Sequence, residues 1–182
     1  MNAVLNFDFA ILDFIRAHIG GDFADTFMKL VTSLGNAGIL WIIITAVLLC
    51  TKKFRIIGLQ MTVGLILGLI FGNLVLKNLV ARPRPFILRG ADIIIKAPRD
   101  YSFPSGHTLA SVISAYILWH NNRKAGIAAA VAAALIAFSR LYLYVHYPTD
   151  IIGGVLLGLI IGFVTIKIFK TEKIRKLFRK KL

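Results

Sequence analysis

Apolar residues in this chain form long, nearly continuous runs, without the strict alternation that is typical of β-strands. A membrane-spanning helix needs about 20 mainly apolar residues, because the hydrocarbon core is ~30 Å thick. By this measure we predict five spans, at residues 34–50, 56–76, 105–119, 125–145 and 151–169. The third run is short, and its Ser111 and Ser114 favour packing against neighbouring helices. The pattern therefore predicts an all-α, polytopic transmembrane helical bundle.

The first 34 residues interrupt this apolar pattern with charged positions. These are Asp8, Asp13, Asp22, Asp25 and Lys29. Two amphipathic helices at the membrane interface, divided near Gly20 and Gly21, fit the pattern best. A sixth span within residues 1–34 is the alternative, and it would place the N-terminus inside. The interrupting charges, with Arg16, argue against a cleavable signal peptide. We expect one membrane-embedded domain over residues 1–182, since the chain has no linker or internal repeat.

Composition supports membrane insertion, and the distribution of charge predicts the orientation. Hydrophobic residues make up 58% of the chain and the mean hydropathy is +0.79, outside the range of ordinary soluble domains. The net charge of +14 could indicate nucleic-acid binding, but basic residues cluster beside the apolar runs, at 51–55, 121–124 and in the tail 170–182. Such clusters mark the cytoplasmic side of a membrane protein. We therefore expect a multi-pass cell-membrane protein with a cytoplasmic C-terminus, which binds the lipid bilayer and no nucleic acid.

This orientation places residues 77–104 and 146–150 outside, and the unusual polar residues gather on that side. They are Lys77, Arg82, Arg84, Ser105, His107, Arg140, His146 and Asp150. Charged groups within or beside hydrocarbon are costly, so these residues are candidates for function. For Lys77 taken alone, a side chain that snorkels to the interface is an equally good explanation.

Several cations and two histidines on one face suit a phosphate group. Pro104, Ser105 and Gly106 directly precede an apolar helix. The amides of Ser105, Gly106 and His107 can therefore point at an anion, which the helix dipole favours. An ordinary serine cap with a loop proline and glycine is the alternative.

His146 and Asp150 lie four positions apart at the start of the last span, where Pro148 favours a new helix. Asp150 can accept a hydrogen bond from the His146 imidazole, which fixes the tautomer and leaves the other ring nitrogen free to attack. Asp150 can equally stabilise the helix dipole, so both roles stay open at this point.

Three segments of the chain resemble the signature motifs of the type 2 phosphatidic acid phosphatase superfamily. They are KNLVARPRP, which begins at Lys77, PSGH at 104–107, and SRLYLYVHYPTD at 139–150. The resemblance covers residues 77–150, and the surrounding hydropathy is similar to that of the bacterial membrane branch. Family spacing selects Arg84 and Pro85, which leaves Arg82 as either a supporting cation or a surface residue. The chain departs from many relatives in lacking a clear first span.

The resemblance implies a phosphohistidine mechanism. His146 would attack phosphorus, oriented by Asp150, while His107 would protonate the leaving oxygen and later activate water. The remaining motif residues would hold the phosphate oxygens through side chains and amides. They are Lys77, Arg84, Arg140, Ser105 and Gly106.

The sequence predicts neither a metal nor a cofactor. Besides Asp150, the outer segments carry the carboxylates Asp92 and Asp100, too few for a two-metal site. The single Cys50 excludes an intrachain disulfide and a multi-cysteine metal site.

Other functions are compatible with the same residues. The superfamily includes vanadium-dependent haloperoxidases, although those relatives are soluble. A phosphatase of soluble sugar phosphates and a non-catalytic lipid-phosphate binder or transporter are two further alternatives. Among lipid phosphates, an outward-facing site favours undecaprenyl pyrophosphate, followed by phosphatidylglycerol phosphate or phosphatidic acid. The loop 86–103 either covers the site or simply connects two helices, and nothing in the sequence indicates an oligomeric state.

Overall fold

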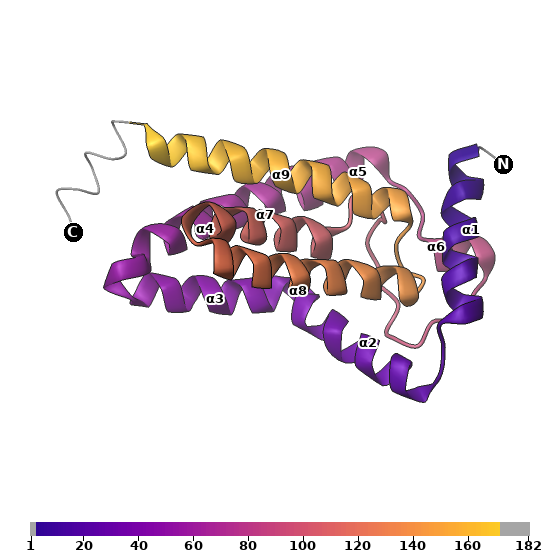
Figure 1. Cartoon of the computed structure of the whole chain (residues 1–182). Coiled ribbons are helices and arrows are strands. Elements are labelled where there is room, and N and C mark those ends of the chain that lie inside the picture. Colours follow the sequence, from indigo (N-terminus) through magenta and orange to yellow (C-terminus); the bar gives the residue numbers. More distant parts are fainter. Residues whose placement is uncertain (1–2, 172–182) are drawn as a thin grey trace.

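The computed structural model describes residues 3–171, and this part of the chain folds entirely into helices and loops (Figure 1). The basic tail predicted at 170–182 lies almost wholly outside the described residues. The helices follow one another as α1 (Ala3–His18), α2 (Asp22–Gly35), η1 (Asn36–Gly38), α3 (Ile39–Cys50), η2 (Lys52–Phe54), α4 (Arg55–Gly68), the π-helical η3 (Leu69–Leu76), α5 (Lys77–Val80), α6 (Pro85–Arg89), α7 (Gly106–Asn121), α8 (Arg123–Tyr142) and α9 (Pro148–Lys170).

Within residues 3–171, four helical stretches are long and apolar enough to cross a membrane. They are Asp22–Cys50, Lys52–Arg89, Arg123–Tyr142 and Pro148–Lys170. The chain is thus an all-helical membrane protein, as predicted, but the predicted number of five spans is not confirmed. The difference is α7, which has only 16 residues.

Helix α7 packs against α4, α8 and α9 and forms the centre of the bundle (Figure 1). Its Ser111 and Ser114 are fully buried, and Trp41 of α3 donates a hydrogen bond to Ser111 Oγ at 2.8 Å. Two of the segments that contact α7, η3 and α9, approach it through glycines. A Cβ added to Gly72 of η3 would lie 2.2 Å from Leu109, and one added to Gly158 of α9 would lie 2.9 Å from Val112. Glycines therefore allow close helix packing around this short helix, and its serines are buried against neighbouring helices, as the sequence predicted.

The first span candidate begins at Asp22, well before the boundary predicted at residue 34. Helix α2 continues through η1 into α3 with a kink, where Ala37 and Gly38 have φ of 50° and 70°. Several of the charges that suggested interfacial helices have partners within the protein, among them Asp8, Asp13 and Asp25. Asp25, for example, accepts a hydrogen bond from Tyr142 at 2.5 Å. A polar residue can therefore belong to this stretch without facing lipid.

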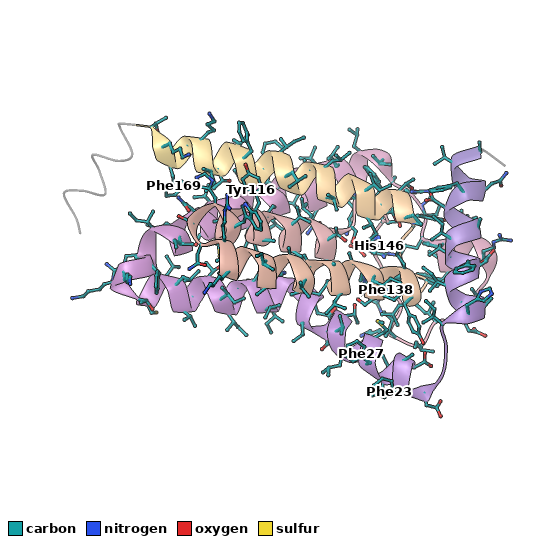
Figure 2. All side chains as sticks on the ribbon, in the orientation of Figure 1. Phe23, Phe27, Tyr116, Phe138, His146 and Phe169 are labelled. Atoms are coloured by element: carbon teal, nitrogen blue, oxygen red, sulfur yellow. The ribbon has the colours of Figure 1, made fainter. Side chains whose placement is uncertain are left out.

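Helix α1 is a separate element that crosses the end of the bundle at a steep angle to α8 and α9 (Figure 1). Gly21, with φ of 121°, allows the sharp change of direction after it. A small apolar cluster holds α1 in place, in which Phe9 and Leu12 contact Tyr144 and Tyr147. The rings of Phe9 and Tyr147 meet edge to face with centroids 5.5 Å apart. Figure 2 shows His146 toward this same end, with Tyr116 and Phe169 toward the other.

Candidate active site

The three motif segments meet at the end of the bundle that α1 crosses, around a cavity of about 390 Å³. Motif residues that line it are Lys77, Arg84, Gly106, His107, Arg140 and His146. The structure thus brings together residues that lie far apart in the sequence. Ser105 and Asp150, the other two predicted site residues, lie behind this lining and are fully buried.

His146 lies in the connection between α8 and α9, and both of its ring nitrogens have partners. Its Nδ1 lies 3.3 Å from Asp150 Oδ2 and its Nε2 lies 3.2 Å from Arg84 Nη1. Because a guanidinium can only donate, Nε2 must accept, which leaves the proton on Nδ1 facing Asp150. Burial lowers the pKa of His146 to about 3. The charges of Arg84 and Arg140 also lower this pKa, and the hydrogen bond that His146 donates to Asp150 opposes the shift. The imidazole is therefore neutral at physiological pH, with the lone pair of Nε2 on the side of the cations.

Asp150 is held from several directions at the first turn of α9. Its Oδ2 accepts hydrogen bonds from the Tyr147 amide at 2.9 Å and from the Ser102 hydroxyl. Its Oδ1 accepts from Arg82 Nη1 at 2.7 Å. The bond to the Tyr147 amide belongs to the capping box that begins α9, so the helix-start role and the contact with His146 coexist in one side chain.

Arg84 is fixed by the loop that precedes α7 and by the connection between α8 and α9. Its Nη1 donates to the Val145 carbonyl at 2.7 Å and its Nε to the Asp100 carbonyl at 2.8 Å. The Asp100 carboxylate bridges two cations, because Oδ1 accepts from Arg84 Nη2 at 2.6 Å and Oδ2 contacts the Lys77 ammonium. Burial would raise the pKa of Asp100, but Lys77 and Arg84 outweigh it and lower this pKa to about 2. Lys77 is buried in an ion pair, so its side chain does not snorkel to the interface.

Helix α2 and η1 supply partners that the sequence did not reveal. Thr32 accepts a hydrogen bond from Arg140 Nη1 at 2.5 Å, while Nε of the same buried guanidinium has no partner within the described chain. His107 Nε2 lies 3.1 Å from Asn36 Oδ1. Gly35 packs directly beneath the His107 ring, where an added Cβ would lie 2.5 Å from Cδ2. Residues near the N-terminus thus hold two side chains of the distant motifs.

The start of α7 partly matches the predicted anion cradle. Ser105 caps the helix, with its Oγ accepting from the Thr108 amide at 3.4 Å, while its own amide donates to the Asp150 carbonyl at 3.2 Å. The Ser105 amide is therefore not directed at the cavity. Gly106 does line the cavity, and a Cβ there would lie 2.8 Å from Asn73 Oδ1. Among residues 3–171, no three His, Cys, Asp or Glu side chains are grouped so that they could hold a metal ion.

Comparison with known proteins agrees with the motifs. A family model described as the PAP2 superfamily matches residues 57–174. The chain belongs to the PAP2 superfamily. An undecaprenyl-diphosphatase of Sulfolobus acidocaldarius is 36% identical over 139 residues, which are 75% of this chain and 67% of that protein. Phosphatidylglycerophosphatase B of Bacillus subtilis is 37% identical over 134 residues, which are 65% of this chain and 62% of that protein.

A solved structure extends the comparison to nearly the whole chain. It is a transmembrane PAP2-type phosphatidylglycerolphosphate phosphatase of Bacillus subtilis, with a TM-score of 0.76 and 29% sequence identity. The similarity covers 92% of this chain and 87% of that chain. The chain belongs to the PAP2 superfamily, its relatives are phosphatases and several of its helices can span a membrane. It is therefore a membrane phosphatase of this superfamily.

Proposed function

We propose that this PAP2 phosphatase hydrolyses undecaprenyl diphosphate to undecaprenyl phosphate at the outer membrane face, through a phosphohistidine on His146. The observation that carries this proposal is the placement of His146. Its Nδ1 faces Asp150, while its Nε2 lies beside Arg84 in a cavity that Lys77 and Arg140 also line. A neutral imidazole with one nitrogen held by a carboxylate is suited to nucleophilic attack.

In the first step, the lone pair of His146 Nε2 attacks the terminal phosphorus. The bond from this phosphorus to the bridging oxygen breaks, and undecaprenyl phosphate leaves with a proton from His107. The Nδ1 proton stays directed at Asp150, whose charge stabilises the cationic phosphoimidazole. In the second step, His107 takes a proton from water, the hydroxide attacks phosphorus, and orthophosphate leaves as His146 is restored.

Charge stabilisation is the main contribution of the surrounding cations. Lys77, Arg84 and Arg140 would contact the oxygens of the transferred phosphoryl group, and Gly106 would offer a backbone amide. Phosphoryl transfer depends mostly on positioning and on neutralisation of these oxygens. The buried, unpartnered Nε of Arg140 supports this role, because an orphaned donor next to a polar cavity gains from an anionic ligand. Ser105 stays a predicted ligand, through its side chain rather than its amide.

Two further lysines support a diphosphate rather than a monophosphate as the substrate. Lys29 of α2 and Lys96 of the 90–105 loop line the same cavity, in addition to the motif cations. A second phosphate carries additional negative charge, which would be balanced by these two ammonium groups. The name of the Sulfolobus relative points the same way.

An adjoining apolar cavity supports a lipid substrate rather than a soluble sugar phosphate. This cavity of about 670 Å³ lies among α3, α4 and α7 and shares Lys77, Gly106 and His107 with the phosphate cavity. Apolar side chains such as Ile42, Leu65 and Ile113 form its wall. A prenyl or acyl chain there would be continuous with a phosphate beside His146. The outward orientation of the site rests on the basic segments 51–55 and 121–124 at the opposite end of the bundle.

Phosphatidylglycerol phosphate is the second candidate substrate. It is favoured by the Bacillus relative and by the solved structure, which are both phosphatases of this lipid by name. Phosphatidic acid is a further alternative with the same reactive group.

The test is kcat/KM in detergent for prenyl diphosphate, prenyl monophosphate, phosphatidylglycerol phosphate and phosphatidic acid, with and without EDTA. We expect the highest value for the prenyl diphosphate, little effect of EDTA and no measurable turnover by His146→Ala. Equal turnover by His146→Ala and wild type would refute the mechanism and favour a non-catalytic binder contaminated by another enzyme.

The role of the two lysines is tested separately. Lys29→Gln and Lys96→Gln should each lower kcat/KM for the diphosphate by about 5- to 10-fold, equivalent to ~1 to 1.4 kcal/mol, with less change for the monophosphate. Lys52→Gln is the matched control, because Lys52 lies between α3 and α4 at the opposite end. Equal losses on both substrates would contradict a second phosphate subsite.

A further inference from the structure

A buried carboxylate of α1 lies next to the proposed catalytic pair, although no motif includes it. Asp8 is fully buried. Its Oδ2 accepts from Arg82 Nη2 at 2.6 Å and from Thr149 Oγ1 at 2.6 Å, and its Oδ1 accepts from the Thr149 amide at 3.0 Å. A buried carboxylate is stable only with such partners. The contacts span up to 141 positions of the sequence and join α1 to the first turn of α9.

Arg82 connects this carboxylate to Asp150. One arm of its guanidinium donates to Asp8, and the other donates to Asp150 Oδ1 at 2.7 Å. The guanidinium also lies over the Tyr147 ring, with Cζ 3.8 Å from the centroid. A planar guanidinium that donates to two carboxylates and lies over an aromatic ring has a well-defined geometry. The ammonium group of a lysine cannot reproduce it. Arg82 is therefore a supporting cation and not a free surface residue, which answers the question left open by the sequence.

We propose that Asp8 and Arg82 are positioning residues for phosphoryl transfer, acting on His146 through Asp150. Arg82 fixes Oδ1 of Asp150, so that Oδ2 is directed at His146 Nδ1. Asp8 offsets the positive charge of Arg82, so that the carboxylate of Asp150 keeps its ability to stabilise the phosphoimidazole cation. Helix α1 then contributes to turnover without touching the substrate, since neither residue lines the phosphate cavity. This inference rests on the proposed role of His146.

The alternative is that the contacts only dock α1 onto the bundle. Asp13 provides a matched control, because it docks the same helix without contacting Asp150. Its carboxylate accepts from Tyr144 at 2.6 Å and from Arg89 at 3.1 Å. Asp8→Asn and Asp13→Asn each remove a carboxylate that docks α1 onto the bundle. Only Asp8→Asn also changes the surroundings of Arg82 and Asp150.

The experiment measures kcat, KM and the rate of phosphoenzyme formation for wild type, Asp8→Asn, Arg82→Lys and Asp13→Asn, with thermal stability in detergent for each. We expect Asp8→Asn and Arg82→Lys to lower kcat and the rate of phosphoenzyme formation by about 10- to 100-fold, the range typical of groups that orient a reactive side chain. KM should change little, because the cations of the cavity are intact. Asp13→Asn should keep kcat within about twofold of wild type at any temperature where it is folded.

Two results would overturn the inference. One is a kcat near the wild-type value in folded Asp8→Asn and Arg82→Lys. The other is an equal loss of kcat in Asp13→Asn, which would show that docking of α1 alone matters. Failure of the proposed function is a different result, since wild type itself would then form no phosphoenzyme or release no phosphate from lipid substrates.

Discussion

Asp100 Oδ1 lies 2.6 Å from Arg84 Nη2, so a carboxylate already contacts one of the cations proposed to bind phosphate. The second oxygen of Asp100 contacts Lys77, another of these cations. Asp100 therefore competes with a phosphate for the same donors, while half of its side chain faces solvent. If Lys77 and Arg84 bind the substrate as proposed, its phosphate takes the place of this ion pair.

From this competition we predict that Asp100→Asn binds orthophosphate more tightly. The inhibition constant should fall by roughly fivefold, because a half-exposed ion pair contributes up to about 1 kcal/mol. Competition assays with orthophosphate give this constant. Asp92→Asn, in the same loop, is the control and should behave as wild type. Weaker binding by Asp100→Asn would instead indicate that Asp100 mainly positions Lys77 and Arg84.

A second prediction concerns Gly35, which leaves room for the His107 ring. In Gly35→Ala the new Cβ would lie 2.5 Å from His107 Cδ2 and 3.0 Å from Ile136, so the ring must move. We expect kcat to fall by at least about 10-fold, toward the ~10²-fold that loss of a general acid causes. Gly20→Ala is the matched control, since an added Cβ there meets nothing within 4 Å. An unchanged kcat in Gly35→Ala would show that the position of His107 is not critical.

The proposed role of His107 as the acid for the leaving group predicts a dependence on the substrate. His107→Ala should slow hydrolysis of a prenyl diphosphate by ~10²- to 10⁴-fold. The loss should be much smaller with p-nitrophenyl phosphate, whose leaving group needs no proton. Rates of product release for both substrates provide the comparison. A similar loss on both would assign His107 to another step.

Burial of neutral His146 makes the stability of the fold depend on pH. Its pKa is lowered from 6.5 to about 3 in the folded protein, so the unfolded chain binds the extra proton first as the pH falls. The contribution of this residue to stability is therefore intact above pH 6.5 and is lost progressively toward pH 3. We expect Tm in detergent to fall between pH 7.5 and pH 5 in wild type, and to fall less in His146→Gln. His120→Gln, a change at an exposed histidine, should retain the wild-type pH dependence.

Local spacing explains what the sequence predicted well. His146 and Asp150 face each other because four positions at a helix start place them on one side, and Pro148 begins α9 where expected. Ser105 caps α7, which was the alternative to an anion cradle formed by its amide. Such features depend on a few neighbouring residues, so the sequence alone is enough to predict them.

Partners that come from distant segments could not be predicted in the same way. Asn36 meets His107 across 71 positions and Thr32 meets Arg140 across 108. The charge of Asp25 suggested an interfacial helix because its partner Tyr142 was not evident. The free-energy cost of these polar residues is offset only in the folded bundle, so their pattern did not reveal that the helical stretch before residue 50 begins as early as Asp22.

The position of α1 across the end of the bundle also bears on how these enzymes diverge. The segment that the family model matches begins at residue 57, so Asp8, Thr32 and Asn36 all lie outside it. A chimera that keeps residues 57–174 and takes its N-terminal part from a relative would retain every signature motif. It would nevertheless lose the native neighbours of Arg82, Arg140 and His107. If these neighbours contribute to turnover as proposed, homologues with identical motifs can differ in turnover because of a region that lies outside the motifs.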